Sequence, residues 1–180
     1  MLKKSFFITL LLICGVLVTF GQNEFDSAKY KSRTLAEIVE LNSDLKSADI
    51  TVSKNTDINI ALKEKTVQTA LYTNLLHSQV RIKFLNKSRP ISTERKDLLN
   101  KWRISLGIDE KIVNLYENEY LFKECNTEYW IPVQKQVASF FPKELKEDDM
   151  IGLFIIRIGG RKLDEKNNWD WLFLSTEFEK

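Results

Sequence analysis

The fold is decided by MIGLFIIRI (residues 150–158) and by WDWLFL (residues 169–174). Both stretches are rich in β-branched and aromatic residues, and a polar loop that begins with Gly159-Gly160 separates them. This pattern predicts an antiparallel hairpin over 150–178 that bends at the glycine pair. In the first stretch both alternating sets of side chains are apolar, so both faces of that strand must be covered. We therefore expect the hairpin to form the centre of the core.

The N-terminus has the composition of an export signal. Two lysines precede an apolar run over 6–20, and Thr19-Phe20-Gly21 places small residues where a signal peptidase cuts. We expect removal of residues 1–21, by cleavage near Gly21-Gln22, and a mature protein that is periplasmic or extracellular. The apolar run is shorter than the roughly 20 residues that span a bilayer, but an uncleaved N-terminal anchor is an alternative. No later stretch predicts a transmembrane span in the mature chain.

Residues 22–180 have the size of a single globular domain. The chain has 27 basic and 25 acidic residues, and the two lysines of the signal leave with it, so the mature charge is close to zero. General nucleic-acid binding is disfavoured because it needs a basic face. Cys125 is the single cysteine of the mature chain. We expect it to be buried, with a reactive thiol or an intermolecular disulfide as alternatives.

The rest of the mature chain carries short helix and strand patterns in no regular β-α-β order. Apolar spacing predicts a helix over 34–45 that starts with a capping box of Thr34 and Glu37, and a helix over 93–106 with Ser92 as its N-cap and Gly107 at its end. Two more helices are predicted from Ile108 to Tyr120 and from Pro132 to Phe141, which Pro142 closes. Strands are predicted over 48–53, 58–62, 80–84, 121–124 and 129–131, and also over 64–77, where helix and strand signals compete. These elements predict an α+β fold. We expect a small curled antiparallel sheet or partly open β-barrel, similar in size to OB and SH3-like barrels, with three or four flanking helices.

The residues for catalysis are few. His77 is the one histidine, and neither it nor Cys125 lies in the glycine-flanked turn that is typical of a nucleophile elbow. One His and one Cys cannot form a zinc site without carboxylates, and the acidic residues from Glu117 to Glu128 lack the spacing of a calcium loop. We expect no metal, no cofactor and no catalytic activity. A small exported hydrolase that uses carboxylates, or Cys125 with His77, is the alternative.

The ligand-binding candidates gather around the predicted hairpin: Arg157, Arg161, Trp169, Trp171 and Tyr129. Arg157 is the one charge within 150–158, and the two tryptophans project from the same face of the partner strand, where an arginine can stack on an indole ring. Such a cluster suits a small anionic ligand or a saccharide. In the alternative interpretation both tryptophans pack in the core and Arg157 reaches water at the strand end.

These observations favour an exported, non-catalytic binding or interaction module. A further alternative is a structural partner of another envelope protein. In that case, an unpaired strand in the region 50–62 would join the sheet of the partner.

Overall fold

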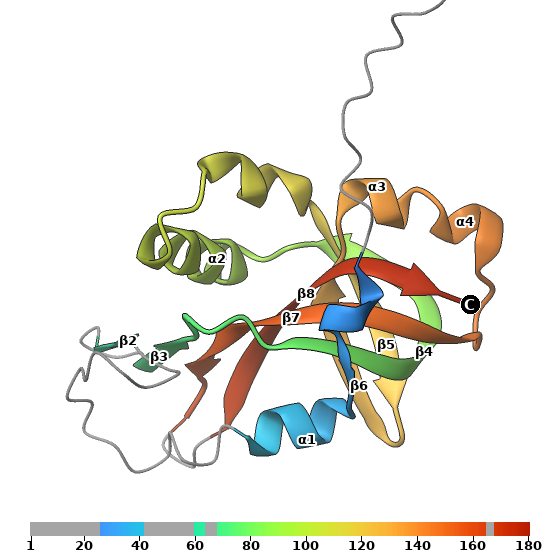
Figure 1. Cartoon of the computed structure of the whole chain (residues 1–180), viewed down its shortest axis with the longest axis horizontal. Coiled ribbons are helices and arrows are strands. Elements are labelled where there is room, and N and C mark those ends of the chain that lie inside the picture. Colours follow the sequence, from blue (N-terminus) through green and yellow to red (C-terminus); the bar gives the residue numbers. More distant parts are fainter. Residues whose placement is uncertain (1–25, 42–59, 64–67, 165–167) are drawn as a thin grey trace, which may run out of the picture.

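The computed structural model describes residues 26–41, 60–63, 68–164 and 168–180 (Figure 1). The predicted signal peptide, the strand predicted over 48–53 and the predicted end of the first helix at 42–45 lie outside the described residues.

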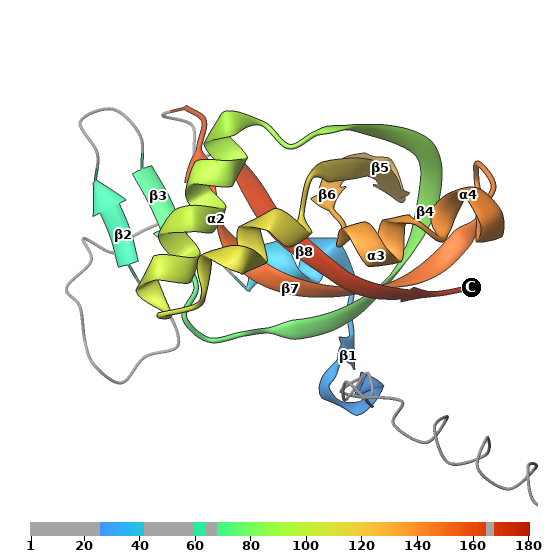
Figure 2. The same cartoon turned by 90° about the horizontal axis from the view of Figure 1, so that it is seen from above.

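The predicted central hairpin is confirmed. Strand β7 (Met150–Lys162) and strand β8 (Trp169–Glu179) pair in antiparallel fashion from Gly152 opposite Glu179 to Lys162 opposite Trp169. The other edge of β7 pairs with β4 (His77–Pro90) and then, beyond Arg157, with β3 (Gln68–Leu71). β7 therefore lies in the interior of the sheet, as its two apolar faces require (Figure 2).

The bend predicted at Gly159-Gly160 is wrong, because both glycines lie inside β7. A Cβ atom on Gly159 would lie 2.2 Å from the backbone oxygen of Ala70, and one on Gly160 would lie 2.5 Å from Cε3 of Trp171. Glycine is needed at both positions because neighbouring groups approach the backbone closely. Since glycine has no side chain, β3 can lie directly against Gly159 and an indole ring directly against Gly160.

The sheet runs in the order β2-β3-β7-β4-β5-β6, with β8 on the free side of β7 and β1 beside β4. The remaining strands are β1 (Lys31–Ser32), β2 (Ile60–Lys63), β5 (Asn118–Glu124) and β6 (Thr127–Pro132). β1 is parallel to β4, and the other pairs are antiparallel. A single parallel bridge, Val133 to Ser175, connects the end of β6 with β8. Within the described residues no ladder continues it, so the sheet is curled but not closed.

The fold is thus a mixture of helices and strands around an antiparallel sheet, which confirms the coarse α+β prediction. Its helices are short. Helix α1 (Leu35–Glu40) starts with the predicted capping box, in which Oγ1 of Thr34 accepts from the Glu37 amide at 3.1 Å and Glu37 accepts from the Thr34 amide at 2.8 Å. Glu124 of β5 accepts a further hydrogen bond from the Leu35 amide at 2.9 Å, which attaches the helix to the sheet.

Helix α2 (Thr93–Ser105) has nearly the predicted length. Oγ of Ser92 caps its first turn by accepting from the Arg95 amide at 3.3 Å. Gly107 ends it in the left-handed region, with φ of 66°, as predicted from the sequence.

Two predicted helices are wrong in kind or extent. The segment after Ile108 forms a 3-10 helix at Glu110–Leu115, because the chain must become extended at Tyr116 before β5 starts. The predicted helix from Pro132 is replaced by two single turns, α3 (Lys135–Ala138) and α4 (Phe141–Glu144). Pro132 ends β6, and Pro142 lies in the first turn of α4, where its fixed φ and missing N–H suit a helix start.

The polar segment before α1 lies against the sheet. The Tyr30 ring contacts Phe154 edge to face, with centroids 5.2 Å apart, and its hydroxyl lies 2.9 Å from Oγ1 of Thr176. Because Phe154 points away from Leu153 and Ile155, this segment covers the second face of β7.

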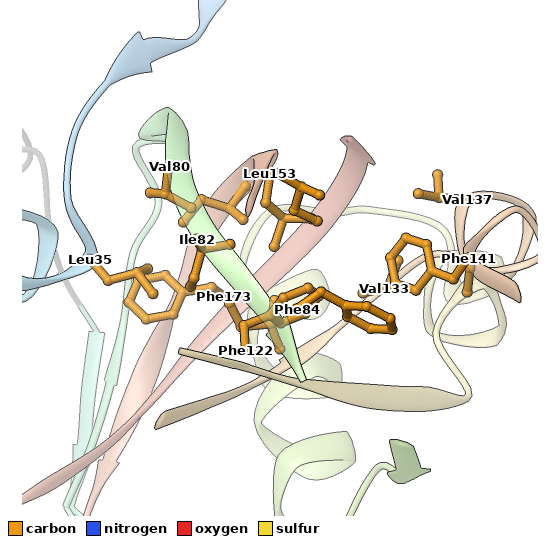
Figure 3. Packing of buried hydrophobic residues seen from close by; sticks show 14 of the residues in the cluster. Leu35, Val80, Ile82, Phe84, Phe122, Val133, Val137, Phe141, Leu153 and Phe173 are labelled. Carbon is orange, nitrogen blue, oxygen red and sulfur yellow. The ribbon is translucent and has the colours of Figure 1, made fainter. Parts of the chain in front are cut away.

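Two hydrophobic clusters lie on opposite faces of the sheet. The inner cluster extends from Leu35 of α1 to Val137 of α3 and Phe141 of α4 (Figure 3). It comprises Leu35, Ile38, Val80, Ile82, Phe84, Phe122, Ile131, Val133, Val137, Ala138, Phe141, Leu145, Ile151, Leu153, Ile155 and Phe173. The outer cluster lies under α2 and comprises Leu71, Ile91, Leu98, Leu99, Trp102, Tyr116, Ile158, Leu172 and Leu174. Both faces of the central hairpin are therefore covered.

The prediction that Cys125 is buried is wrong. Its side chain is exposed, because the residue lies in the two-residue turn between β5 and β6 with φ of 52°. Across the described part of the chain, no helix has both the length and the hydropathy of a membrane span.

Candidate functional site

Arg157 lies within β7, and its guanidinium group stacks on a tyrosine ring and not on a tryptophan ring. Its side chain is 8% exposed, and its guanidinium carbon lies 3.8 Å from the centroid of the Tyr72 ring. Nη1 also donates to the backbone oxygen of Ile38, at 3.4 Å. Burial lowers the pKa of Arg157, and burial raises the pKa of Tyr72 against the opposing effect of the arginine. Arg157 therefore holds Tyr72 and α1 against β7 from a buried position.

Trp169 and Trp171 continue this arrangement towards the surface. Their rings are nearly parallel, with centroids 5.0 Å apart and planes at 15°. Trp171 lies over Gly160 and approaches Tyr72, with centroids 6.3 Å apart. We call Tyr72, Trp171 and Trp169 the aromatic stack. It begins at a fully buried tyrosine and ends at the half-buried Trp169, which faces Lys162 across the hairpin.

Arg161 and Tyr129 do not join the aromatic stack. Arg161 is opposite Asp170, and because side chains alternate along a strand both point to the face that carries α2. There Arg161 helps to lower the pKa of Glu94, which falls mainly through hydrogen bonds from its backbone amide and from Ser92. Tyr129 packs on the inner cluster from β6, and burial raises its pKa. The five predicted residues are thus divided among three places.

The structure contains a polar cluster that the sequence analysis missed. Nη1 of Arg95, on α2, donates to Oε2 of Glu119 at 2.6 Å and to the backbone oxygen of Trp130 at 2.6 Å. Its Nε donates to Oδ2 of Asp170 at 3.2 Å. Arg89 donates to the other oxygen of Glu119 and lies 4.0 Å above the Trp130 ring. We call Arg89, Arg95, Glu119 and Asp170 the ion network.

The ion network has the geometry of a structural clamp. Arg95 joins β6, through Trp130, to β8, through Asp170, across the gap where the sheet is not closed. The Glu119 side chain is 0% exposed and lies between two guanidinium groups. Burial by itself would lower the pKa of Arg95. The hydrogen bonds and charges of Asp170 and Glu119 have the larger combined effect, so the pKa of Arg95 is raised. Glu119 and Asp170 lie 24 and 75 residues from Arg95 along the chain, so no local pattern could have indicated that they meet.

His77 and Cys125 have different surroundings. His77 packs its ring on Tyr30, and its Nδ1 lies 3.0 Å from the backbone oxygen of Leu75. Cys125 is exposed in the turn between β5 and β6. Among the side chains that the structure describes, no group of three or more His, Cys, Asp or Glu residues could hold a metal.

A small pocket of about 230 Å³ lies between the start of β5, the end of β6 and α3. Val133 and Ala138 in its lining are buried, Tyr120 is half-buried, and its exposed rim includes Glu117, Lys135 and Ser139. Glu117 and Lys135 form an ion pair with each other. None of the predicted site residues lines this pocket, whose lining comes from two stretches of the chain, 117–120 and 133–139.

Comparison with known proteins gives no relative: no protein-family description, no curated protein and no solved structure matches the chain.

Proposed function

We propose that the protein is an exported, non-catalytic binding module that holds a ring-shaped ligand against Trp169, at the outer end of the aromatic stack. The observation that supports this is the near-parallel pair of Trp169 and Trp171, whose centroids are 5.0 Å apart. Trp171 occupies one side of Trp169, so a ligand ring added on the other side would extend the stack by one member. Buried Tyr72 and Arg157 hold the inner end in place.

The chemistry of this end of the stack suits a saccharide or a small anionic ring. An indole face stacks on flat apolar surfaces, and each aromatic stacking contact contributes roughly 0.5–1.5 kcal/mol. Lys162 lies opposite Trp169 across the hairpin and is half-buried, so it supplies a positive charge next to the ring. A cation at this position favours a ligand with a carboxylate, a sulfate or a phosphate group.

The curled sheet fits the same proposal. We describe it as a partly open barrel, similar in size to OB and SH3-like barrels, with its helices at the ends and over one face. OB-folds bind oligosaccharides and oligonucleotides on a strand face. This is an analogy at the level of the fold, which does not assign a function by itself.

The test is a titration of residues 22–180 with glucose, N-acetylglucosamine and glucuronate, followed by tryptophan fluorescence. We expect saturable binding of at least one probe, with glucuronate favoured by Lys162. Trp169→Ala should weaken it about five- to tenfold, as loss of one stacking contact implies.

Arg161→Ala is the matched control, since Arg161 points to the opposite face of the same hairpin and should leave the affinity unchanged. The proposal is wrong if no probe binds, or if Trp169→Ala and Arg161→Ala give the same affinity as the unchanged protein.

A second candidate function is strand addition to another envelope protein. β2 is the last strand of the sheet order and, within the described residues, pairs with β3 alone. Its second edge could pair with a strand of a partner. Mass measurement by size-exclusion chromatography and light scattering tests this function, and a strict monomer that co-purifies with no protein argues against it.

A further inference from the structure

The pocket between β5, β6 and α3 has an apolar floor of Tyr120, Val133 and Ala138. Val133 is held on two sides: its amide donates to the backbone oxygen of Asn118 at 3.3 Å, and the residue forms the bridge to Ser175. The Tyr120 ring contacts Phe141 edge to face, with centroids 5.0 Å apart. Ala138 contributes a methyl group at 9% exposure. This floor offers a ligand an apolar surface that is already in place before binding.

The rim of the pocket carries two opposite charges, Glu117 and Lys135, which form an ion pair with each other. Their side chains are 61% and 46% exposed. Exposed ion pairs contribute little to stability, so this pair can open at small cost. A ligand that brings one positive and one negative group can replace both halves of the pair.

We propose that this pocket binds a free amino acid with an apolar side chain of medium size. The ammonium group of the ligand lies against Glu117, its carboxylate lies against Lys135, and its side chain lies on Tyr120, Val133 and Ala138. A ligand with a single charge pairs with one rim residue, repels the other and leaves the ion pair broken. The volume of about 230 Å³ is below the roughly 300–1,000 Å³ of pockets for drug-sized ligands, which favours a ligand of this small size.

This inference is independent of the proposed function at Trp169, because the two sites share no residue. Trp169→Ala should therefore leave amino-acid binding unchanged, and failure of one proposal leaves the other standing.

The experiment is isothermal titration calorimetry of residues 22–180 with L-leucine. The comparison ligands are 3-methylbutylamine, which lacks the carboxylate, and 4-methylpentanoate, which lacks the ammonium group. We expect L-leucine to bind and each single-charge analogue to bind at least about tenfold more weakly, as loss of a charge-assisted hydrogen bond implies. Phosphoethanolamine is included because a lipid headgroup is the other common source of a small zwitterion.

Glu117→Gln and Lys135→Gln should each weaken L-leucine binding by about tenfold, since both remove a charge at an exposed position and leave the fold intact. Lys143→Gln, on the exposed side of α4, is the matched control and should have no effect. The proposal is overturned if L-leucine does not bind, if both rim variants bind it normally, or if a single-charge analogue binds as well. Preference for phosphoethanolamine over L-leucine would also overturn the assignment to an amino acid.

Discussion

At the scale of single residues, Gly159 and Gly160 of β7 show how the lack of a Cβ atom lets a neighbouring strand and a side chain pack against the backbone. Gly159 and Gly160 have no unusual φ, and their role is to leave room for Ala70 and Trp171. The sequence pattern of two glycines before a polar loop indicated a bend, because a turn is the commonest reason for such a pair. Close approach of another strand is the reason in this protein.

Gly159→Ala should therefore destabilise the fold by about 1–3 kcal/mol, because the new Cβ would overlap the backbone oxygen of Ala70, which cannot move without shifting β3. Urea denaturation measures the change. Gly152→Ala is the matched control, because its Cβ would meet the flexible side chain of Glu179, which can rotate away. Equal losses for the two variants would contradict this account.

Tyr116 gives a prediction for alkaline pH. Burial raises its pKa from 10.0 to about 12, although the hydrogen bond from Gln134 opposes the shift. The unfolded chain releases this proton first, so the free energy of unfolding falls as the pH rises from about 10 towards 12, by about 2–3 kcal/mol in total. Below pH 10 the contribution is fully present.

Tyr116→Phe should flatten this decrease. The measurement is urea denaturation at a series of pH values from about 9 to 11, where both proteins are still folded. Parallel curves for the two proteins would rule out Tyr116 as the cause.

At the scale of elements, helix α2 connects the two strands on either side of the opening in the sheet. Its apolar side covers the outer cluster, and Arg95 at its start connects β6 with β8. The apolar spacing of α2, its Ser92 cap and its Gly107 end were all predicted from the sequence, because they depend on neighbours within one or two turns. The partners of Arg95 were not predicted, since they lie on strands far along the chain.

Arg95→Met should destabilise the protein by about 3–5 kcal/mol, because it removes one of the two cations that neutralise the buried carboxylate of Glu119. Combining it with Glu119→Gln should restore part of the loss, since the remaining side chain is then neutral. A double-mutant cycle by urea denaturation measures the coupling. Additive effects of the two changes would show that Arg95 and Glu119 are not coupled. Lys96→Met, one residue further along and exposed, is the control.

At the scale of the whole molecule, the protein is one curled sheet with a cluster on each face. The inner cluster draws residues from five strands and three helices, and Leu153 at its centre is 0% exposed. Separation of the two hairpin strands would open both clusters at once.

Leu153→Asp should accordingly abolish stable folding, because an unpaired carboxylate in the core costs several kcal/mol out of a total stability of about 5–15 kcal/mol. Near-ultraviolet circular dichroism, which reports fixed packing of the aromatic rings, should lose its signal. Arg161→Ala on the same strand should change stability by less than about 0.5 kcal/mol, as most surface substitutions do. A folded Leu153→Asp variant would contradict the central position of this strand.

The amino-acid sequence by itself determined the central hairpin, its burial on both faces, the start of α1 and both ends of α2. Each of these follows from side-chain alternation or from a cap a few residues away. The tertiary structure alone decided that Arg157 stacks on Tyr72, that Arg161 points away from the two tryptophans, and that the ion network and the pocket between β5, β6 and α3 exist. These features depend on which strands become neighbours, and strand pairing brings together residues whose separation along the chain carries no local signal.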